Sequence, residues 1–447
     1  MASTGKTLDI AIVGGSLGGL FAATPLLRMP QKHRVTILER SGTPLLHDQG
    51  AGVVAGGSVQ KWVEKFDVFG KEARVTSKTR TYLNREGQIV DREDLTQWMT
   101  SWDLLYQLGR ANFDGQQSGH VANQWDQVSD GPDGERVKEA WGRAKYEYGR
   151  AVEGLELAGD KVQISWRDTR EGSPQKGEPG TLVVDFVVCA DGPSSGMRKM
   201  LLNDKASQRI YAGYVAFRGT VPETELDDPA RDAFVEKFTF FHTQGIQILG
   251  YTIPGANGDL ELGKRLVNWV WYWNFPEDSE EYKEVLTDSN GNRHRYTLPT
   301  GGHIGEEVWN RQKGRAKEVL PPQFAQLVQK TQKPFVQAIT DVTAPAQGAP
   351  VGRLLGGKAA LLGDALAGFC PHTAASTSQA AFDALMLERA FAGEITWGQY
   401  EENVLQYANT WQRKGVMLGT CSQFENISTH ASPLTMMARD QQFASRD

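Results

Sequence analysis

The sequence predicts an α/β fold with two interleaved parts and a helical C-terminal tail. The apolar run LDIAIVGG, residues 8–15, stops at glycines, and a second apolar strand, RVTILER, follows at residues 34–40. With a helical pattern between them, these segments form a βαβ unit. Over residues 208–275 the composition changes to aromatic segments that alternate along the chain, as expected for an antiparallel sheet. A mostly helical pattern then covers residues 399–427.

The composition is typical of a globular protein with more than one domain. The 447 residues are 40% hydrophobic and 23% charged, and the net charge of −6 argues against a nucleic acid or an anionic membrane as partner. The three cysteines lie far apart without metal-ligand or disulfide spacing, which favours a reducing compartment. No run of 18 apolar residues is present, and the first strand begins at Leu8. We therefore expect a cytoplasmic protein with neither a membrane span nor a signal peptide.

A glycine-rich turn follows the first strand. In IVGGSLGGL, Gly14 makes the turn, Ser16 stands where a second glycine usually lies, and Gly19 allows the helix to pack closely on the strand. Backbone N–H groups in such a turn, and the helix N-terminus behind it, face a pyrophosphate. Glu39, at the end of the second strand, is placed to accept hydrogen bonds from a ribose. An ordinary glycine-rich turn is the alternative, but the complete βαβ context favours a dinucleotide.

A second motif, CADGPSSGMR, closes another apolar strand that begins near residue 181. The strand ends in Asp191-Gly192, and Ser195 and Arg198 follow at the start of a helix. Asp-Gly by itself is typical of a turn, and Arg198 by itself is typical of a solvated surface. Beside a dinucleotide motif, however, this segment favours a second contact region for the cofactor.

The third motif, GDALAGFCPHTAAS, begins at Gly363. Asp364 follows at a strand end, where its carboxylate is placed to accept hydrogen bonds from ribityl hydroxyls. Pro371 fixes the start of a helix, and the small residues 373–376 let its N-terminus approach a flavin ring, whose reduced anionic form the helix dipole favours. The three motifs together predict FAD rather than NAD. For His372, the alternative to a functional role is a histidine satisfied by backbone at the helix start.

These motifs, in this order, resemble those of the single-component FAD-dependent aromatic hydroxylases, the p-hydroxybenzoate and salicylate hydroxylase class. The segments YAGYVAFRGTVPE, KFTFFHTQGIQILGYTIPG and NWVWYWN narrow the resemblance to the 2,6-dihydroxypyridine 3-hydroxylase branch. The resemblance extends over residues 8–391 and implies FAD, with NADPH or NADH and O2 as co-substrates. It implies hydroxylation of an electron-rich, phenol-like or hydroxypyridine-like small aromatic ring through a flavin C4a-hydroperoxide, and often a homodimer.

The resemblance also implies a flavin-binding set drawn from all three motifs. Glu39 and Arg40 would bind the adenosine side of FAD, Asp191 would lie near the pyrophosphate, and Gln107 stands roughly where the class has a flavin-contacting side chain. Ala374 stands where salicylate-type relatives have a glycine. In full, the predicted cofactor-binding residues are Gly14, Gly15, Ser16, Leu17, Gly19, Glu39, Arg40, Gly52, Gln107, Asp191, Gly363, Asp364, Ala374, Ala375 and Ser376.

Catalytic and substrate-binding residues are predicted from the same chemistry. An electron-rich ring becomes more nucleophilic when a base removes its hydroxyl proton, and the candidate bases are His242 and His372, with Pro371 beside the latter. Aromatic side chains of the predicted sheet would clamp a flat ring, and the candidates are Tyr214, Phe241, Tyr251, Trp269 and Trp271. The alternative is that each of these aromatics fills the core. No metal site is predicted.

We thus expect a Rossmann-like FAD-binding domain interleaved with an antiparallel β-sheet substrate domain, plus C-terminal helices. Within them we expect a hairpin over residues 80–91, a helix over 101–113 and a β-meander over 145–168. The FAD-binding parts are predicted at 1–78, 101–206 and 343–392, the substrate parts at 79–100 and 207–342, and the helical tail at 393–447.

Two further functions stay open on the sequence alone. The same flavin chemistry would serve epoxidation or oxidative rearrangement of a larger aromatic or indole natural product, with the polar segment 115–142 widening or covering the pocket. A protein that binds flavin as a sensor or scaffold, without oxygenase activity, is the alternative of another class. The presence of all three motifs together favours an oxygenase.

Overall fold

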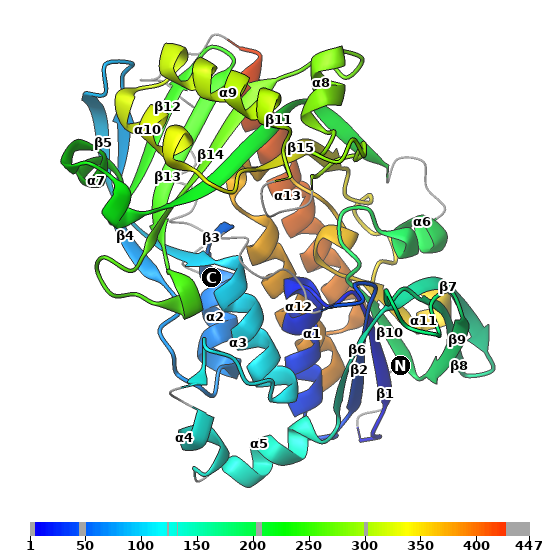
Figure 1. The fold of residues 1–447 in the computed structure, drawn as a ribbon. Helices are drawn as coiled ribbons and strands as arrows, with labels where there is room; N and C mark the ends of the chain where they lie inside the picture. The colour runs from blue at the N-terminus through cyan, green and yellow to red at the C-terminus, as the bar shows by residue number, and fades with distance from the viewer. Residues whose placement is uncertain are drawn as a thin grey trace.

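The computed structural model of the chain describes residues 5–43, 51–122, 125–131, 133–202, 208–298 and 303–425. These residues form a five-stranded parallel sheet, an eight-stranded mixed sheet and a three-stranded antiparallel sheet. Figure 1 shows the large sheet and the parallel sheet in different parts of the molecule, with helices between them. This arrangement confirms the predicted fold class.

The parallel sheet is built from chain segments that lie far apart in the sequence. Its strand order is β16-β10-β1-β2-β6, and every pairing in it is parallel. The strands are β1 (Asp9–Val13), β2 (Arg34–Glu39), β6 (Ala144–Tyr148), β10 (Phe186–Cys189) and β16 (Ala359–Leu361). Since parallel strands end at the same edge, the carboxyl ends of β1, β10 and β16 bring the three predicted motifs together.

One predicted element is wrong in this sheet. The alternation over residues 145–168 predicted a β-meander, but β6 leaves that segment and pairs with β2. The chain turns away at Gly149, which has a φ of +69°. An alternation of apolar and polar residues with period two indicates a strand, but it does not indicate which strand that segment pairs with. The antiparallel strands are instead β7 (Arg150–Ala158), β8 (Lys161–Asp168) and β9 (Pro179–Val184), which form the small sheet.

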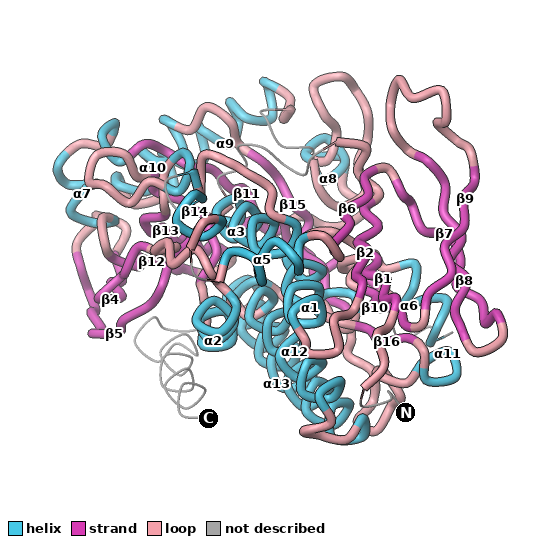
Figure 2. The backbone as a smooth tube through the Cα atoms, turned by 90° about the horizontal axis from the view of Figure 1, so that it is seen from below, coloured by secondary structure: helices cyan, strands magenta, loops and turns pink. Residues whose placement is uncertain are grey.

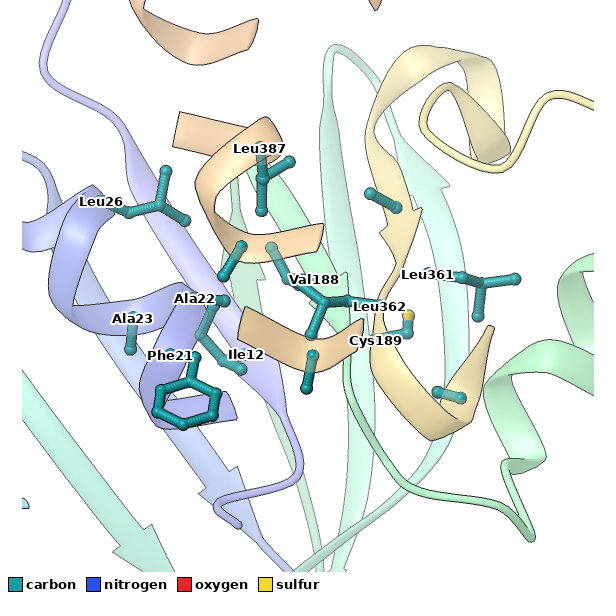
Figure 3. Packing of buried hydrophobic residues seen from close by; sticks show 14 of the residues in the cluster. Ile12, Phe21, Ala22, Ala23, Leu26, Val188, Cys189, Leu361, Leu362 and Leu387 are labelled. Carbon is teal, nitrogen blue, oxygen red and sulfur yellow. The ribbon is translucent and has the colours of Figure 1, made fainter. Parts of the chain in front are cut away.

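Helices α1 (Leu17–Arg28) and α12 (Ser376–Ala392) pack against the parallel sheet. Figure 3 shows Phe21 and Leu26 of α1 in one apolar cluster with Leu387 of α12 and Val188 of β10. Four of the five residues of β1 and all of β10 are buried, which explains their continuous apolar sequences. This shared core fixes where α1 begins relative to the strands.

Pro25 lies inside α1 without ending it, although a proline inside a helix commonly kinks or breaks it. A proline has no N–H, so the carbonyl four residues earlier, that of Phe21, loses its helical donor. Trp62 of α2 (Gly57–Phe66) donates its Nε1–H to that carbonyl at 2.9 Å. The helix therefore continues because a side chain from a neighbouring helix replaces the missing hydrogen bond.

The large sheet has the order β15-β11-β14-β13-β12-β4-β5-β3, and among these described strands only β12 and β4 pair in parallel. Strands β4 and β5 confirm the predicted hairpin around Glu86-Gly87 and are longer than predicted. The strands are β3 (Gly52–Val54), β4 (Val75–Leu83), β5 (Ile89–Ser101), β11 (Arg209–Pro222), β12 (Lys237–Thr243), β13 (Ile246–Ile253), β14 (Leu266–Asn274) and β15 (Phe335–Val342).

Four helices cover the outer face of the large sheet, and Figure 1 shows them along one side of its strands. They are α7 (Asp228–Phe234), α8 (Glu280–Val285), α9 (Glu306–Val319) and α10 (Pro322–Lys330). The inner face of the sheet is lined by a separate apolar cluster. The two faces therefore have different environments, which decides what the side chains of each strand do.

The longest helix, α13 (Trp397–Gln423), joins the two sheets. It packs on α12, and its last turn contacts β12 and β14 of the large sheet. Figure 2 shows α1, α2, α12 and α13 grouped between the strands of the two sheets. The predicted helix over 399–427 is confirmed as far as Gln423, and its last two residues lie outside the described residues.

The predicted helix after the hairpin is confirmed as α3 (Trp102–Asp114). The Ser101 hydroxyl caps the N-terminus of this helix by accepting a hydrogen bond from Leu104 N at 3.2 Å. The remaining α-helices are α4 (Trp125–Ser129), α5 (Gly134–Trp141), α6 (Gly196–Leu202) and α11 (Leu354–Gly357). Across the described ranges, no helix is both long enough and apolar enough to cross a membrane. The domain boundaries stay predictions.

Candidate active site

In the glycine-rich turn between β1 and α1, Gly14 and Gly19 have no room for a side chain. Gly14 adopts a φ of +100°, and a Cβ there would lie 2.4 Å from the Ala190 carbonyl oxygen. A Cβ on Gly19 would lie 2.0 Å from the Gly14 carbonyl oxygen. Ser16 makes no side-chain capping hydrogen bond, so the first N–H groups of α1 stay available to an anion. The turn is therefore a cradle made of backbone.

Glu39 closes this cradle from the end of β2. Its carboxylate is buried and accepts hydrogen bonds from Gly15 N at 2.8 Å and from Ser41 N at 2.7 Å. The Tyr146 hydroxyl donates to the Gly15 carbonyl at 2.8 Å from the other side. Arg40 is exposed beside them. Glu39 thus holds the turn in shape and remains within reach of a group bound there.

The second motif is tied to its own helix and to the third motif. Asp191 accepts hydrogen bonds from Ser195 Oγ at 2.5 Å and from Met197 N at 3.2 Å, at the start of α6. Arg198 is not the surface residue considered from the sequence, since its relative exposure is 0%. Its guanidinium donates to the carbonyls of Pro193 at 2.7 Å, Asp364 at 3.1 Å and Ala365 at 2.9 Å. Arg198 therefore fastens one motif to the other.

The third motif presents a carboxyl group toward the space between the sheets. Gly363, with a φ of +61°, donates its N–H to Asp383 Oδ2 at 2.9 Å. Asp364 Oδ1 is buried and has no hydrogen-bond partner among the described residues. Burial raises the pKa of Asp364. A buried acceptor without a donor is what a ribityl hydroxyl would satisfy.

Three further residues of the predicted flavin-binding set are Gln107, Gly52 and Ala374. Gln107 of α3 is buried, and its Oε1 has no hydrogen-bond partner among the described residues. Gly52 donates its N–H to Asn268 Oδ1 at 3.0 Å, and a Cβ on it would lie 2.6 Å from the Tyr251 hydroxyl oxygen. Ala374 has a φ of +53° just before α12 begins. Together with the backbone cradle, Asp364 Oδ1 and Gln107 Oε1, which are buried without a partner among the described residues, fit an elongated dinucleotide such as FAD.

A cavity of 380 Å³ lies between the start of α12 and the inner face of the large sheet. Asp364 and residues 371–377 line one side of it. The sheet lines the other side with the apolar and aromatic residues Phe238, Phe240, Leu249, Tyr251, Val270 and Tyr272. This is the size and character of a small-molecule site.

The structure brings only part of the predicted aromatic set to this cavity. Tyr251 lines it, and Tyr214 lies behind it in the same inner cluster. Phe241, Trp269 and Trp271 point to the outer face instead, where Trp269 donates to Thr331 Oγ1 at 2.8 Å. Successive residues of a strand point to opposite faces, so the neighbours Phe240, Val270 and Tyr272 face the cavity in their place.

Both ring nitrogens of His372 face protein polar groups, whereas His242 has such a partner only at Nε2 among the described residues. His372 Nε2 lies 3.0 Å from the Tyr214 hydroxyl, and its Nδ1 lies 2.8 Å from Gln247 Oε1. His242 Nε2 lies 3.0 Å from the Ser422 carbonyl. Burial, with a contribution from His242, lowers the pKa of His372 to about 3, and burial also lowers the pKa of His242. The imidazole of His372 is therefore neutral at pH 7.

Sequence reasoning missed the charged and amide groups that line the cavity. Arg218 of β11, Gln247 of β13 and Arg80 of β4 all do so. Arg80 donates to Gln97 Oε1 at 2.6 Å and lies over the Phe238 and Phe240 rings. The alternation of side chains along each strand could have identified them. Each of these three residues lies on the same sheet face as the cavity-lining aromatics, and the tryptophans lie on the opposite face.

Comparison with known proteins agrees with this geometry. Residues 211–341 match a family model described as FAD binding domain-like. The 2,6-dihydroxypyridine 3-monooxygenase of Paenarthrobacter nicotinovorans is 28% identical over 385 residues, which cover 86% of this chain and 82% of that protein. The 6-hydroxynicotinate 3-monooxygenase of Pseudomonas fluorescens is 24% identical over 421 residues, which cover 90% of this chain and 89% of that protein.

Solved structures show the same fold. The 2,6-dihydroxypyridine-3-hydroxylase from Arthrobacter nicotinovorans has a TM-score of 0.76 at 24% identity, with 96% of each chain covered. A salicylate hydroxylase substrate complex has a TM-score of 0.63 at 15% identity, with 99% of this chain and 96% of that chain covered. The comparisons confirm the predicted resemblance, and with it the predictions of a monooxygenase and of FAD as its cofactor.

Proposed function

Because this chain is homologous to the FAD-dependent aromatic monooxygenases, we propose that it hydroxylates a small, electron-rich aromatic ring of the hydroxypyridine or phenol type. A ring C–H bond would be replaced by C–OH, one atom of O2 would enter the ring, and the other would leave as water while NAD(P)H is oxidised. The cavity that faces both the third motif and the aromatic sheet face is the observation that carries this proposal. The relatives that act on dihydroxypyridine and hydroxynicotinate support it.

FAD, when bound, would supply the electron transfer and oxygen activation that amino acid side chains lack. The backbone of the Gly14–Gly19 turn would hold the pyrophosphate, and Glu39 the adenosine ribose. Asp364 would accept from ribityl hydroxyls, and the start of α12 would lie at the flavin ring. The buried Oδ1 of Asp364 and Oε1 of Gln107, which have no partner among the described residues, support these assignments.

The protein would hold the substrate ring flat and exclude water. Phe238, Phe240, Tyr251 and Tyr272 present ring faces and edges to the cavity, and Leu249 and Val270 add apolar surface. An apolar enclosure protects a reactive oxygen donor from water. Neither histidine is well placed as the base, because His372 already faces Tyr214 and Gln247, and His242 is not among the described residues that line the cavity. We therefore assign His372 a structural part in this site rather than proton abstraction.

The relatives that act on dihydroxypyridine and hydroxynicotinate favour a small substrate over the alternative of a larger natural product. The route of oxygen transfer, the choice between NADPH and NADH, the cytoplasmic location and the homodimer stay predictions.

The test is flavin reduction by NADPH, and separately by NADH, followed without oxygen at the flavin absorbance. Wild-type protein would be mixed with 2,6-dihydroxypyridine, 6-hydroxynicotinate or a phenol. We expect one of these rings to accelerate bleaching by at least about tenfold, because substrate commonly gates reduction in this class. Bound FAD with no response to any small ring would overturn the small-ring assignment, and failure to bind FAD would overturn the oxygenase assignment itself.

A further inference from the structure

Side chains of the inner sheet face form a grid whose register is fixed by strand pairing. Arg218, Val270, Leu249 and Phe240 stand in one row across β11, β14, β13 and β12. Tyr272 and Gln247 stand in the next row, with Tyr272 two residues after Val270 on β14 and Gln247 two residues before Leu249 on the antiparallel β13. Side chains in such adjacent rows are close enough to contact one small ring from two sides. Three members of this grid carry polar groups, and two of them, Arg218 and Gln247, have N–H groups that can donate to an oxygen of the ring.

The orientation of the Gln247 amide is fixed by its neighbours. Gln247 is 1% exposed, and its Oε1 lies 2.8 Å from His372 Nδ1 and 2.8 Å from Ser422 Oγ. The Ser422 hydroxyl oxygen already accepts a hydrogen bond from Gln423 Nε2 at 2.7 Å, so its proton goes to Gln247. The neutral His372 donates from Nδ1 and accepts from the Tyr214 hydroxyl at Nε2. Gln247 Oε1 therefore accepts hydrogen bonds from both His372 and Ser422 and points away from the cavity.

This leaves the Gln247 amide N–H groups for the cavity that the residue lines. Ser422 belongs to α13, so the last turn of the long C-terminal helix sets the orientation of a side chain in the large sheet. His242 Nε2 and the Ser422 carbonyl hold the same turn in place at 3.0 Å. A donor fixed in this way would lose little freedom when a ligand accepts from it.

Arg218 supplies a positive charge on the same grid. Its Nε is buried and has no hydrogen-bond partner among the described residues. Among the described residues that line the cavity, Arg80, Arg209 and Arg218 face one carboxylate, that of Asp364. A buried guanidinium whose Nε lacks a partner favours a ligand that brings a negative oxygen.

We propose that Gln247 is a substrate-positioning residue, which donates with Arg218 to an anionic oxygen of the ring and is held in that orientation by His372 and Ser422. The anionic oxygen is that of an ionised ring hydroxyl or of a carboxylate. This inference rests on the proposed function, because it assumes that the cavity takes an aromatic ring.

The test measures equilibrium binding to the flavin-loaded protein by the change in flavin absorbance, without NAD(P)H and therefore without turnover. The probes are 2,6-dihydroxypyridine above and below the pH of its ionisation, benzoate as a carboxylate without a hydroxyl, and 2,6-dimethoxypyridine as a neutral ring. Gln247→Glu has nearly the same shape but replaces the donor with an acceptor. We expect it to weaken binding of the anionic probes by at least about tenfold and binding of the neutral ring by no more than about twofold.

Two more variants separate positioning from charge and from structure. Gln337→Glu places the same added charge on another glutamine that lines the cavity, and we expect a clearly smaller loss than for Gln247→Glu. Ser422→Ala removes one of the two donors to Gln247 Oε1, and we expect about a threefold loss that again falls on the anionic probes. Flavin content and thermal unfolding show that each variant is folded.

The outcomes distinguish this inference from the proposed function. Equal losses for anionic and neutral probes, equal losses for Gln247→Glu and Gln337→Glu, or an unchanged affinity in Gln247→Glu would each overturn the positioning role. Binding of only one anionic probe identifies whether a ring hydroxyl or a carboxylate is recognised. If no ring binds to flavin-loaded wild-type protein, the proposed function fails, and this inference fails with it.

Discussion

The turn after β1 and the inner face of the large sheet both contribute to the candidate site, but they do so by different means. The turn works through backbone: Gly14 and Gly19 have no space for a Cβ, and the carboxylate of Glu39 accepts from backbone N–H groups. The sheet face works through side chains: Phe240, Val270 and Gln247 line the cavity because of the face on which their strands place them.

We call the turn the backbone half of the site and the inner sheet face the side-chain half, and the two halves should tolerate substitutions differently. The backbone half depends on a few positions that cannot accept any side chain, whatever its chemistry. In the side-chain half, successive residues of a strand point to opposite faces of the sheet, so neighbouring residues have unrelated roles. The following changes test that contrast, from the largest expected effect to the smallest.

Gly14→Val would break the backbone half. A Cβ at this position lies 2.4 Å from the Ala190 carbonyl oxygen, and a β-branched residue at a φ of +100° is strained in addition. We expect the flavin content of the purified protein to fall by more than about tenfold, measured by absorbance after denaturation. Gly18→Ala is the matched control, since its added methyl group meets its nearest neighbour at 3.5 Å. Normal flavin content in Gly14→Val would contradict the cradle.

Arg198→Met would separate two motifs that the backbone half needs together. The change keeps much of the side-chain volume but removes the donors to the three carbonyls of Pro193, Asp364 and Ala365. Buried carbonyls left without partners should lower the free energy of unfolding by about 3 kcal/mol. Chemical denaturation measures this, with the exposed Arg167→Met as control. A loss no larger than that of the control would show that water replaces Arg198.

Adjacent residues of β14 should give opposite results in the side-chain half. Val270→Phe fills the cavity, so we expect about a tenfold loss of ring binding with little change in unfolding. Trp271→Phe leaves a space in the outer cluster, so we expect a loss of about 2 kcal/mol in stability with unchanged ring binding. Ring affinity and denaturation midpoints of both variants decide this. The reverse pattern would show that the strand has the opposite phase.

Asp383 gives the backbone half its own dependence on pH. Burial raises the pKa of Asp383 to about 8 from an ordinary value near 3.8, although the N–H of Gly363 opposes that shift. The folded protein then holds a proton that the unfolded chain releases, so stability is full below about pH 4 and falls as the pH rises toward 8. Asp383→Asn should match wild type at pH 4 and gain on it progressively up to pH 8 in thermal unfolding.

The exposed Asp130→Asn is the control for that series, and we expect it to run parallel to wild type at every pH. A constant difference between Asp383→Asn and wild type across the range would contradict a buried, protonated carboxyl. A stability difference between Asp383→Asn and wild type that grows only below pH 4 would have the opposite pH dependence and would show that Asp383 is ionised in the folded protein.

The sequence by itself determined the parts whose meaning is local. LDIAIVGGSLGGL specifies a buried strand, a tight turn and a helix within 13 residues, because each step depends on neighbours in the chain. The hairpin around Glu86-Gly87 and the cap of α3 at Ser101 were predictable for the same reason. Gly363 and Asp364 were identified from a strand that ends in a turn.

Tertiary structure alone decided the parts that depend on partners far away in the chain. Alternation predicts that Trp271 and Tyr272 face opposite sides, but only the helices packed on the outer face show which side is the cavity. Nothing near Gln247 in the sequence indicates that Ser422, 175 residues away, fixes its amide. Arg198 is buried because three carbonyls from two segments surround it. The alternation along a strand assigns each residue to one of two sheet faces, and the tertiary structure decides which of those faces packs against helices and which lines the cavity.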